Sequence, residues 1–130
     1  IIFNNTEARQ FLNKATHPET LIRSKKLIEF YQGKGKSPLI VLDAPLLIES
    51  GAHELVEKVW VIYCSKATQI RRLMERNSLD YEEALVRIQS QMSLEEKLLY
   101  ADETINTEGT IKETEVKVEN LWIKYFGKVY

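Results

Sequence analysis

Residues 33–47 read GKGKSPLIVLDAPLL, and the apolar run inside this stretch, Leu39 to Leu42, decides the fold class. Four consecutive apolar residues are typical of a strand that is covered on both faces. A second run of this kind covers residues 59–64. The connection between the runs contains a helical pattern near residues 54–57 and is long enough for a right-handed crossover. We therefore expect an α/β fold in which both runs are parallel strands of a three-layer structure, with helices on both faces of the sheet.

The basic part of the same stretch is similar to the end of a phosphate-binding loop. Gly35-Lys36-Ser37 matches the last three positions of G-x-x-x-x-G-K-[ST], but the first glycine of the motif is replaced by Phe30. The motif also requires a strand before it and a helix after it, whereas here the expected strand follows. Residues 33–37 are therefore interpreted as a basic turn that ends a helix, and not as a P-loop.

The composition describes a globular protein of one ordinary domain. The chain has 130 residues, of which 44% are hydrophobic and 28% charged, so it is long enough to bury a core. Its formal net charge of −1 gives no indication of a nucleic acid or an anionic membrane as partner. The apolar runs are too short to span a bilayer, and residues 1–6 do not have the pattern of a signal peptide. The single cysteine, Cys64, excludes an internal disulfide and favours a reducing compartment. We expect the cytoplasm, with an organelle as the alternative.

The remaining elements follow from apolar periodicity and from helix caps. A helix that Thr6 caps is expected to stop at Thr16-His17-Pro18, because the residue before a proline is disfavoured in helical geometry. A second helix is expected from Pro18 to the glycine at 33. The sequence further predicts helices over 65–76, 80–91 and 93–100, a short strand over 103–105, a turn over 106–110 and a helix over 111–126.

Two features of this pattern could carry chemistry. Asp43 directly follows the first apolar run, where open parallel sheets bind ligands and where a Walker B carboxylate helps to hold magnesium on a nucleotide. An ordinary turn residue is the equally open alternative for Asp43. Arg72 and Arg76 are four residues apart on one helix face, and two guanidinium groups there suit phosphate oxygens. The alternative is a solvated face on which Glu75 and nearby acids neutralise the arginines.

The order of these parts resembles the C-terminal two-thirds of the dephospho-coenzyme A kinase family. The opening segment, from Ile2-Phe3 to His17-Pro18, is also similar to that family, so the resemblance covers nearly the whole chain. The other residues that carry it are Asp43-Ala44-Pro45-Leu46-Leu47 with Glu49, Gln69, Arg72, Arg76, Arg87, Gln91, Lys97, Ala101-Asp102 and the turn that ends at Gly109.

The resemblance implies a P-loop kinase fold with a helical lid, and an activity that transfers the γ-phosphoryl group of ATP to the ribose 3′-hydroxyl of dephospho-coenzyme A. This is the last step of coenzyme A biosynthesis, and it implies ATP, Mg²⁺ and dephospho-coenzyme A as ligands. Arg72 and Arg76 would begin the lid and face the transferring phosphates, with Asp43 as a third catalytic candidate that helps to hold the metal indirectly. The acceptor side would be lined by Pro45, Leu46, Leu47 and Glu49, with His17 close by. The adenine side would be formed by the turn that contains Asn106, Thr107 and Gly109.

Two of these assignments have alternatives in the sequence itself. His17 could equally be a helix-boundary residue without a ligand. The family usually has Asp-Asn where this chain has Asn106-Thr107, so backbone groups of the turn could serve for the adenine instead of side chains.

The resemblance also implies an organisation for a single partial kinase domain. A helical substrate-side region would cover about residues 1–37, core strands 38–64, lid helices 65–100, and a C-terminal strand, adenine turn and helix 101–130. The family's first strand, its Walker A loop and the acidic residue thought to act as base would lie upstream of Ile1. We therefore expect residues 1–130 alone to lack kinase activity and to bind ATP weakly, because phosphoryl transfer needs that loop.

Two other functions remain open from the sequence. One is a nucleoside monophosphate kinase with a different acceptor, against which the Asp-x-Pro-Leu-Leu segment and Glu49 argue. The other is a non-catalytic domain that binds a nucleotide or a partner chain. A G-x-x-x-x-G-K-[ST] motif directly upstream in the gene would separate the kinase from this second alternative.

Overall fold

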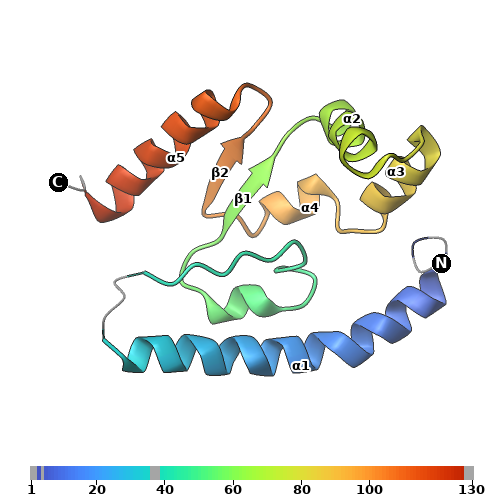
Figure 1. Ribbon diagram of the computed structural model, residues 1–130. Coiled ribbons are helices and arrows are strands. Elements are labelled where there is room, and N and C mark those ends of the chain that lie inside the picture. The colour runs from blue at the N-terminus through green and yellow to red at the C-terminus, as the bar shows by residue number, and fades with distance from the viewer. Residues whose placement is uncertain (1–2, 4, 36–38, 128–130) are drawn as a thin grey trace. The chain divides into compact units, whose positions relative to one another are not determined.

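The computed structural model describes Phe3, residues 5–35 and residues 39–127. These residues divide into two compact units, Ile1–Glu57 with Ser90–Met92 and Lys58–Gln89 with Ser93–Tyr130, and each unit is described by itself. Residues 36 and 37 of the expected basic turn lie outside the described residues. Figure 1 labels most of the elements along the chain. No helix in the described ranges has both the length and the apolar character that are needed to cross a bilayer.

The first unit begins with a single long helix, α1, which spans Thr6–Gly33. The predicted break at residues 16–18 is therefore wrong, and so is the predicted cap. Asn5 caps the helix instead of Thr6, and its side-chain oxygen accepts a hydrogen bond from the backbone N–H of Ala8 at 2.9 Å.

Pro18 lies inside α1 because a proline removes only one backbone donor and disfavours, without forbidding, helical geometry at the residue before it. Two hydroxyl groups bind the helix backbone on either side of Pro18. Thr16 donates to the carbonyl of Leu12 and Thr20 donates to the carbonyl of Thr16, both at 2.9 Å. Figure 1 shows that α1 is curved, as expected of a long helix that contains a proline.

The segment that follows α1 contains turns and a short 3₁₀ helix, η2, over Ala52–Leu55. The strand predicted at residues 39–42 is wrong, because the described backbone there forms no ladder and Val41 is 77% exposed. Apolar composition indicates that a segment prefers burial, but a strand also requires a neighbour whose backbone groups complete its hydrogen bonds. The buried residues of this segment are Ile48 and Ala52, which lie after the apolar run.

The second unit contains a parallel two-stranded sheet of β1, Trp60–Tyr63, and β2, Glu103–Asn106. The register pairs Trp60 with Glu103 and Tyr63 with Asn106. Both strands lie where the sequence predicts strands, and the parallel α/β class is confirmed. The partner of β1 differs from the prediction, since β1 pairs with β2 and not with residues 39–42.

The helices of the second unit agree closely with the sequence prediction. Ser65 caps α2, Lys66–Asn77, and Ser78 ends it in a left-handed conformation with φ 52°, which confirms the predicted break at this point. The other helices are α3, Tyr81–Gln89, α4, Leu94–Leu98, with a capping box, and α5, Ile111–Phe126, also with a capping box. Helix α5 contacts β2, α4 contacts β1, and α2 contacts α3.

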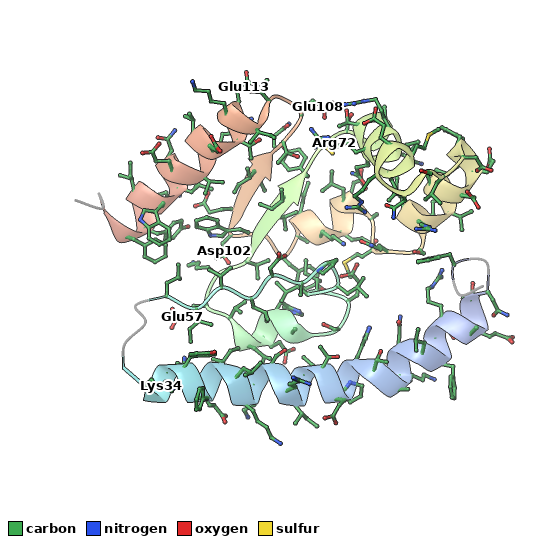
Figure 2. The ribbon with its side chains drawn as sticks, viewed as in Figure 1. Lys34, Glu57, Arg72, Asp102, Glu108 and Glu113 are labelled. Carbon is green, nitrogen blue, oxygen red and sulfur yellow. The ribbon has the colours of Figure 1, made fainter. Side chains whose placement is uncertain are left out.

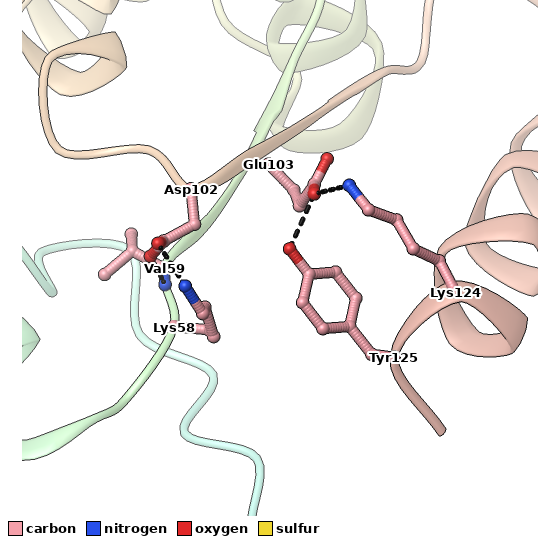
Figure 3. Close-up of polar contacts among 6 residues, drawn as sticks. All are labelled: Lys58, Val59, Asp102, Glu103, Lys124 and Tyr125. Carbon is pink, nitrogen blue, oxygen red and sulfur yellow. Dashed lines mark hydrogen bonds and ion pairs between the residues drawn. The ribbon is translucent and has the colours of Figure 1, made fainter. Parts of the chain in front are cut away.

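Polar side chains form hydrogen bonds at the end of the sheet where both strands begin (Figure 3). The carboxylate of Asp102 accepts hydrogen bonds from the Lys58 ammonium and from the backbone N–H of Val59, both at 2.8 Å. The carboxylate of Glu103 accepts hydrogen bonds from Lys124 and, at 2.6 Å, from the hydroxyl of Tyr125. The first pair of contacts joins the beginnings of β1 and β2, and the second joins β2 to α5.

We predict that Ile105→Ala lowers the free energy of unfolding of the intact protein by about 2–5 kcal/mol, as expected for a large-to-small change in a packed core. Ile105 is the most buried large side chain described, at 2% exposure. Its neighbour in the ladder, Ile62, is 57% exposed and provides the matched control. Ile62→Ala should cost less than about 1 kcal/mol in the same denaturant titration. Equal losses for both variants would contradict the assignment of the core.

A second prediction concerns acid stability. Hydrogen bonds from Lys124 and Tyr125 lower the pKa of Glu103, so its contribution to stability is present above the ordinary pKa of a glutamate. The contribution is lost as the pH falls through the lower folded value. Melting temperatures measured from about pH 6 down to about pH 3 should therefore fall more steeply for the wild type than for Glu103→Gln. The control is Glu119→Gln, an exposed carboxylate of α5, which should leave the wild-type slope unchanged. A wild-type slope in Glu103→Gln would show that Glu103 is not involved.

Candidate functional site

The parallel pairing of β1 and β2 places the carboxyl ends of both strands at one edge of the sheet, where the chain turns after each strand. The turn after β2 is tied to the end of β1 through Thr107. The backbone N–H of Thr107 donates to the carbonyl of Tyr63 at 2.8 Å, and its hydroxyl donates to the same carbonyl at 3.1 Å. The turn is therefore fixed by hydrogen bonds to the neighbouring strand.

Arg72 of α2 reaches this turn and binds it with both ends of its guanidinium group. One terminal nitrogen donates to the hydroxyl of Thr107 at 3.2 Å, and the other donates to the carbonyl of Thr107 at 2.7 Å. A planar guanidinium is suited to such a two-pronged contact. The structure thus brings together Arg72 and Thr107, which the sequence placed in one ligand site, although it assigned them to the phosphate and adenine sides respectively.

Glu108 is a residue of the same turn that the sequence reasoning missed. Its carboxylate accepts hydrogen bonds from the backbone N–H of Ser65 at 2.7 Å, from the Ser65 hydroxyl at 3.1 Å and from the hydroxyl of Thr68. The hydrogen bond from Thr68, followed by those from Ser65, lowers the pKa of Glu108, and the charge of Arg72 acts in the same direction. Figure 2 shows Arg72 and Glu108 at the same end of the sheet.

The other turn residues have structural partners that explain their identity. The side-chain oxygen of Asn106 accepts a hydrogen bond from the backbone N–H of Glu108 at 2.8 Å, and its carbonyl accepts one from Lys117 at 2.7 Å. A Cβ at Gly109 would meet the Glu113 carboxylate, which accepts a hydrogen bond from the backbone of Thr110 in the capping box of α5. A side chain at position 109 would therefore displace this cap.

Arg76 does not join Arg72 at the turn. Its Nε donates to the side-chain oxygen of the adjacent Asn77 at 3.0 Å, and the residue is exposed. Because Arg76 lies one helical turn beyond Arg72, the two share a face of α2. Within the described ranges no hydrogen bond joins Arg76 to residues 106–109.

The predicted acceptor-side residues and Asp43 all belong to the first unit. Asp43 is exposed, His17 is half-buried in the middle of α1, and Glu49 accepts a hydrogen bond from the backbone N–H of Met92 at 3.1 Å. This contact ties residues 90–92 to the segment after α1. The remaining predicted residues are the exposed Pro45 and the half-buried Leu46 and Leu47.

Two further observations concern a metal cluster and a surface hollow. No group of three or more His, Cys, Asp or Glu side chains in the described ranges is arranged to hold a metal ion. An open hollow of about 540 Å³ lies against α2 and is lined by residues that include Ile70, Met74 and Tyr81. The predicted site residues Arg72 and Arg76 do not line it, so the hollow is not part of the site at the turn.

Comparison with known proteins identifies the family. The family model described as dephospho-CoA kinase matches residues 1–113. A dephospho-CoA kinase of Bacillus cereus is 46% identical over 119 residues, which cover 92% of this chain and 59% of that protein. A dephospho-CoA kinase of Carboxydothermus hydrogenoformans is 41% identical over 128 residues, which cover 98% of this chain and 62% of that protein.

Two solved structures are similar to this chain in fold, and one of them is a dephospho-CoA kinase. The crystal structure of TT1252 from Thermus thermophilus matches with a TM-score of 0.71 and 26% identity, over 97% of this chain and 64% of that one. Dephospho-CoA kinase from Campylobacter jejuni matches with a TM-score of 0.57 and 34% identity, over 98% of this chain and 63% of that one. The chain thus spans about three-fifths of the length of the relatives it matches.

We predict that Arg72→Lys loosens the turn almost as much as Arg72→Ala, because lysine cannot make both contacts with Thr107 at once. Amide hydrogen exchange at Thr107 and Glu108, whose backbone N–H groups are hydrogen-bonded, should speed up on the order of tenfold in both variants of the intact protein. Exchange in β1 should change much less. Arg71→Ala is the matched control, since Arg71 pairs with Glu75 on its own helix and not with the turn. Unchanged exchange in both Arg72 variants would show that the contact does not hold the turn in solution.

Proposed function

Because the chain belongs to the dephospho-CoA kinase family, we propose that the intact protein transfers the γ-phosphoryl group of ATP to the ribose 3′-hydroxyl of dephospho-coenzyme A. The observation that carries this proposal is the family match over residues 1–113. The arrangement of Arg72 and the turn after β2 supports it, because the carboxyl ends of parallel strands are where open α/β sheets bind nucleotides.

The adenine of ATP is proposed to bind at the turn of residues 106–109. Several polar groups of the turn are occupied by the protein itself, including the carbonyl groups of Asn106 and Thr107. Among the described contacts, the carbonyl of Glu108 and the backbone N–H of Gly109 have no hydrogen-bond partner. These two groups are suited to a base that offers both a donor and an acceptor edge.

The two arginines of α2 are proposed to have different roles. Arg72 is held at the turn, so its guanidinium would lie at the base side of ATP instead of at the transferring phosphate. Arg76 uses its Nε for Asn77, and its terminal nitrogens have no partner among the described residues. Arg76 would therefore be the group that meets the charge on the phosphates, where a guanidinium is most effective.

The acceptor is proposed to bind to residues of the first unit. Pro45, Leu46 and Leu47 offer apolar surface, and Glu49 is oriented through its hydrogen bond with Met92. His17 would lie close to the acceptor, on the side that these residues line. These assignments follow the family resemblance of the Asp-x-Pro-Leu-Leu segment.

Asp43 fits a role in holding Mg²⁺. Protein sites for this ion typically supply one or two carboxylates, and water and substrate phosphates complete the coordination. Asp43 is an exposed carboxylate that water and phosphates could also reach. A Mg²⁺ site of this kind does not require several protein ligands around it. Bound Mg²⁺ would neutralise charge on the ATP phosphates during the transfer.

The direct test is incubation of the intact protein with Mg²⁺, γ-labelled ATP and dephospho-coenzyme A. We expect label on the ribose 3′-position of the product and ADP formation that depends on the acceptor. Nucleoside monophosphates should accept little label. Preferential labelling of a nucleoside monophosphate would support a different kinase, and no transfer to any acceptor would contradict the proposal.

We predict that Arg76→Ala and Arg76→Lys both lower kcat of the intact protein on the order of a hundredfold or more, by analogy with other arginines that stabilise transferring phosphates. Lysine should fail because it cannot offer the planar two-pronged contact. The melting temperature should change little, since Arg76 is exposed. Steady-state kinetics and a melting curve on the same samples separate the two effects. Full activity together with a much lower melting temperature would make Arg76 a structural residue.

A further inference from the structure

We propose that Glu108 is a positioning residue of the nucleotide site, which locks the turn after β2 to the first turn of α2 and so orients Arg72 towards the base. This inference rests on the proposed binding of ATP at the turn. It concerns a side chain that neither the sequence pattern nor the family match singles out.

The carboxylate of Glu108 accepts three hydrogen bonds from residues at the start of α2. One carboxylate oxygen accepts from the backbone N–H of Ser65, and the other accepts from the hydroxyls of Ser65 and Thr68. Thr68 is buried, with 8% exposure, so its hydroxyl has little access to water as an alternative partner. A negative charge is also favourable near the N-terminus of a helix.

The adjacent residues Thr107 and Glu108 therefore contact two successive helical turns of α2. Glu108 binds Thr68, and Thr107 binds Arg72, which is four residues further along the helix. Residues four apart lie on one helix face, so both contacts act along a single stripe of α2. Arg76 continues this stripe by another four residues. Glu108 therefore helps to fix the rotation of α2 about its own axis. This rotation determines the directions in which Arg72 and Arg76 point.

Glutamine can reproduce only part of the hydrogen bonding of Glu108. If the oxygen of a glutamine accepted the two hydroxyl groups, its NH₂ group would face the backbone N–H of Ser65, and two donors would meet. The reverse orientation would satisfy Ser65 N–H, but the NH₂ group would then donate to the hydroxyls, which would have to turn from donors into acceptors and would lose their charge-assisted hydrogen bonds to a carboxylate. An ionised carboxylate accepts all three hydrogen bonds, and the neighbouring donors and Arg72 favour this ionised form.

The test compares Glu108→Gln with the wild type in the intact protein. We expect KM for ATP to rise on the order of tenfold, KM for dephospho-coenzyme A to stay within about twofold, and amide exchange at Ser65 and Thr68 to speed up. Glu75→Gln is the matched control, because Glu75 is a carboxylate of α2 itself that pairs with Arg71 and, among the described contacts, does not bind the turn after β2. It should leave both KM values unchanged.

The outcomes separate a positioning role from a purely structural one. Faster amide exchange with an unchanged KM for ATP would overturn the proposal, because Glu108 would then be only a helix cap. Equal rises in both KM values, or unfolding of the variant at the assay temperature, would also overturn it.

The dissociation constant for ATP, measured by calorimetry, keeps this test independent of the proposed reaction. If the wild type binds ATP but does not phosphorylate dephospho-coenzyme A, the proposed reaction fails while weaker ATP binding by Glu108→Gln still supports the positioning role. If the wild type does not bind ATP, the positioning role fails as well.

Discussion

The parallel pairing of β1 with β2 is the constraint on which the second unit depends. Because the strands run in the same direction, the residues that leave them, Ser65 after β1 and Thr107 after β2, lie at one edge of the sheet. The hydrogen bonds of Thr107 to Tyr63, of Arg72 to Thr107 and of Glu108 to Ser65 all require this arrangement. An antiparallel pair would place the two turns at opposite ends of the sheet, and none of these contacts could form.

The opposite edge of the sheet has a different role. There Asp102 and Glu103 bind Lys58, Lys124 and Tyr125, which fixes the starting end of the strands and the end of α5. One edge thus stabilises the packing of α5 on β2, and the other carries the turn and the arginine-bearing helix at which we propose that ATP binds. This division agrees with the general placement of function at the carboxyl ends of parallel strands.

Local signals in the sequence predicted most of the second unit. Ser65 and Ser93 begin helices as predicted caps, and the predicted break at Asn77-Ser78 is confirmed by the left-handed Ser78. The first unit was predicted less well, for two physical reasons. A proline stops a helix only when the lost hydrogen bond is not compensated by the rest of the structure, and Pro18 lies inside a continuous α1. An apolar run becomes a strand only when a neighbouring strand completes its ladder, and residues 39–42 have none in the described structure.

The site shows the same limit of sequence reasoning. The family resemblance assigned Arg72 and the turn residues Asn106, Thr107 and Gly109 to a nucleotide site, but it did not predict the direct contact of Arg72 with Thr107. The role of Glu108 could not be predicted at all, because its partners Ser65 and Thr68 are about 40 residues away in the sequence and depend on the register of the sheet. A carboxylate in a turn is too common a feature to indicate such a contact.

The most direct test of a nucleotide site at this edge is a titration of the intact protein with ATP, followed by backbone NMR. The largest chemical-shift changes should fall in the turn of residues 106–109 and in α2, with smaller changes in α5. Saturable ATP binding that leaves the signals of Thr107, Glu108 and Gly109 unchanged would contradict the placement of the nucleotide at the carboxyl end of β2.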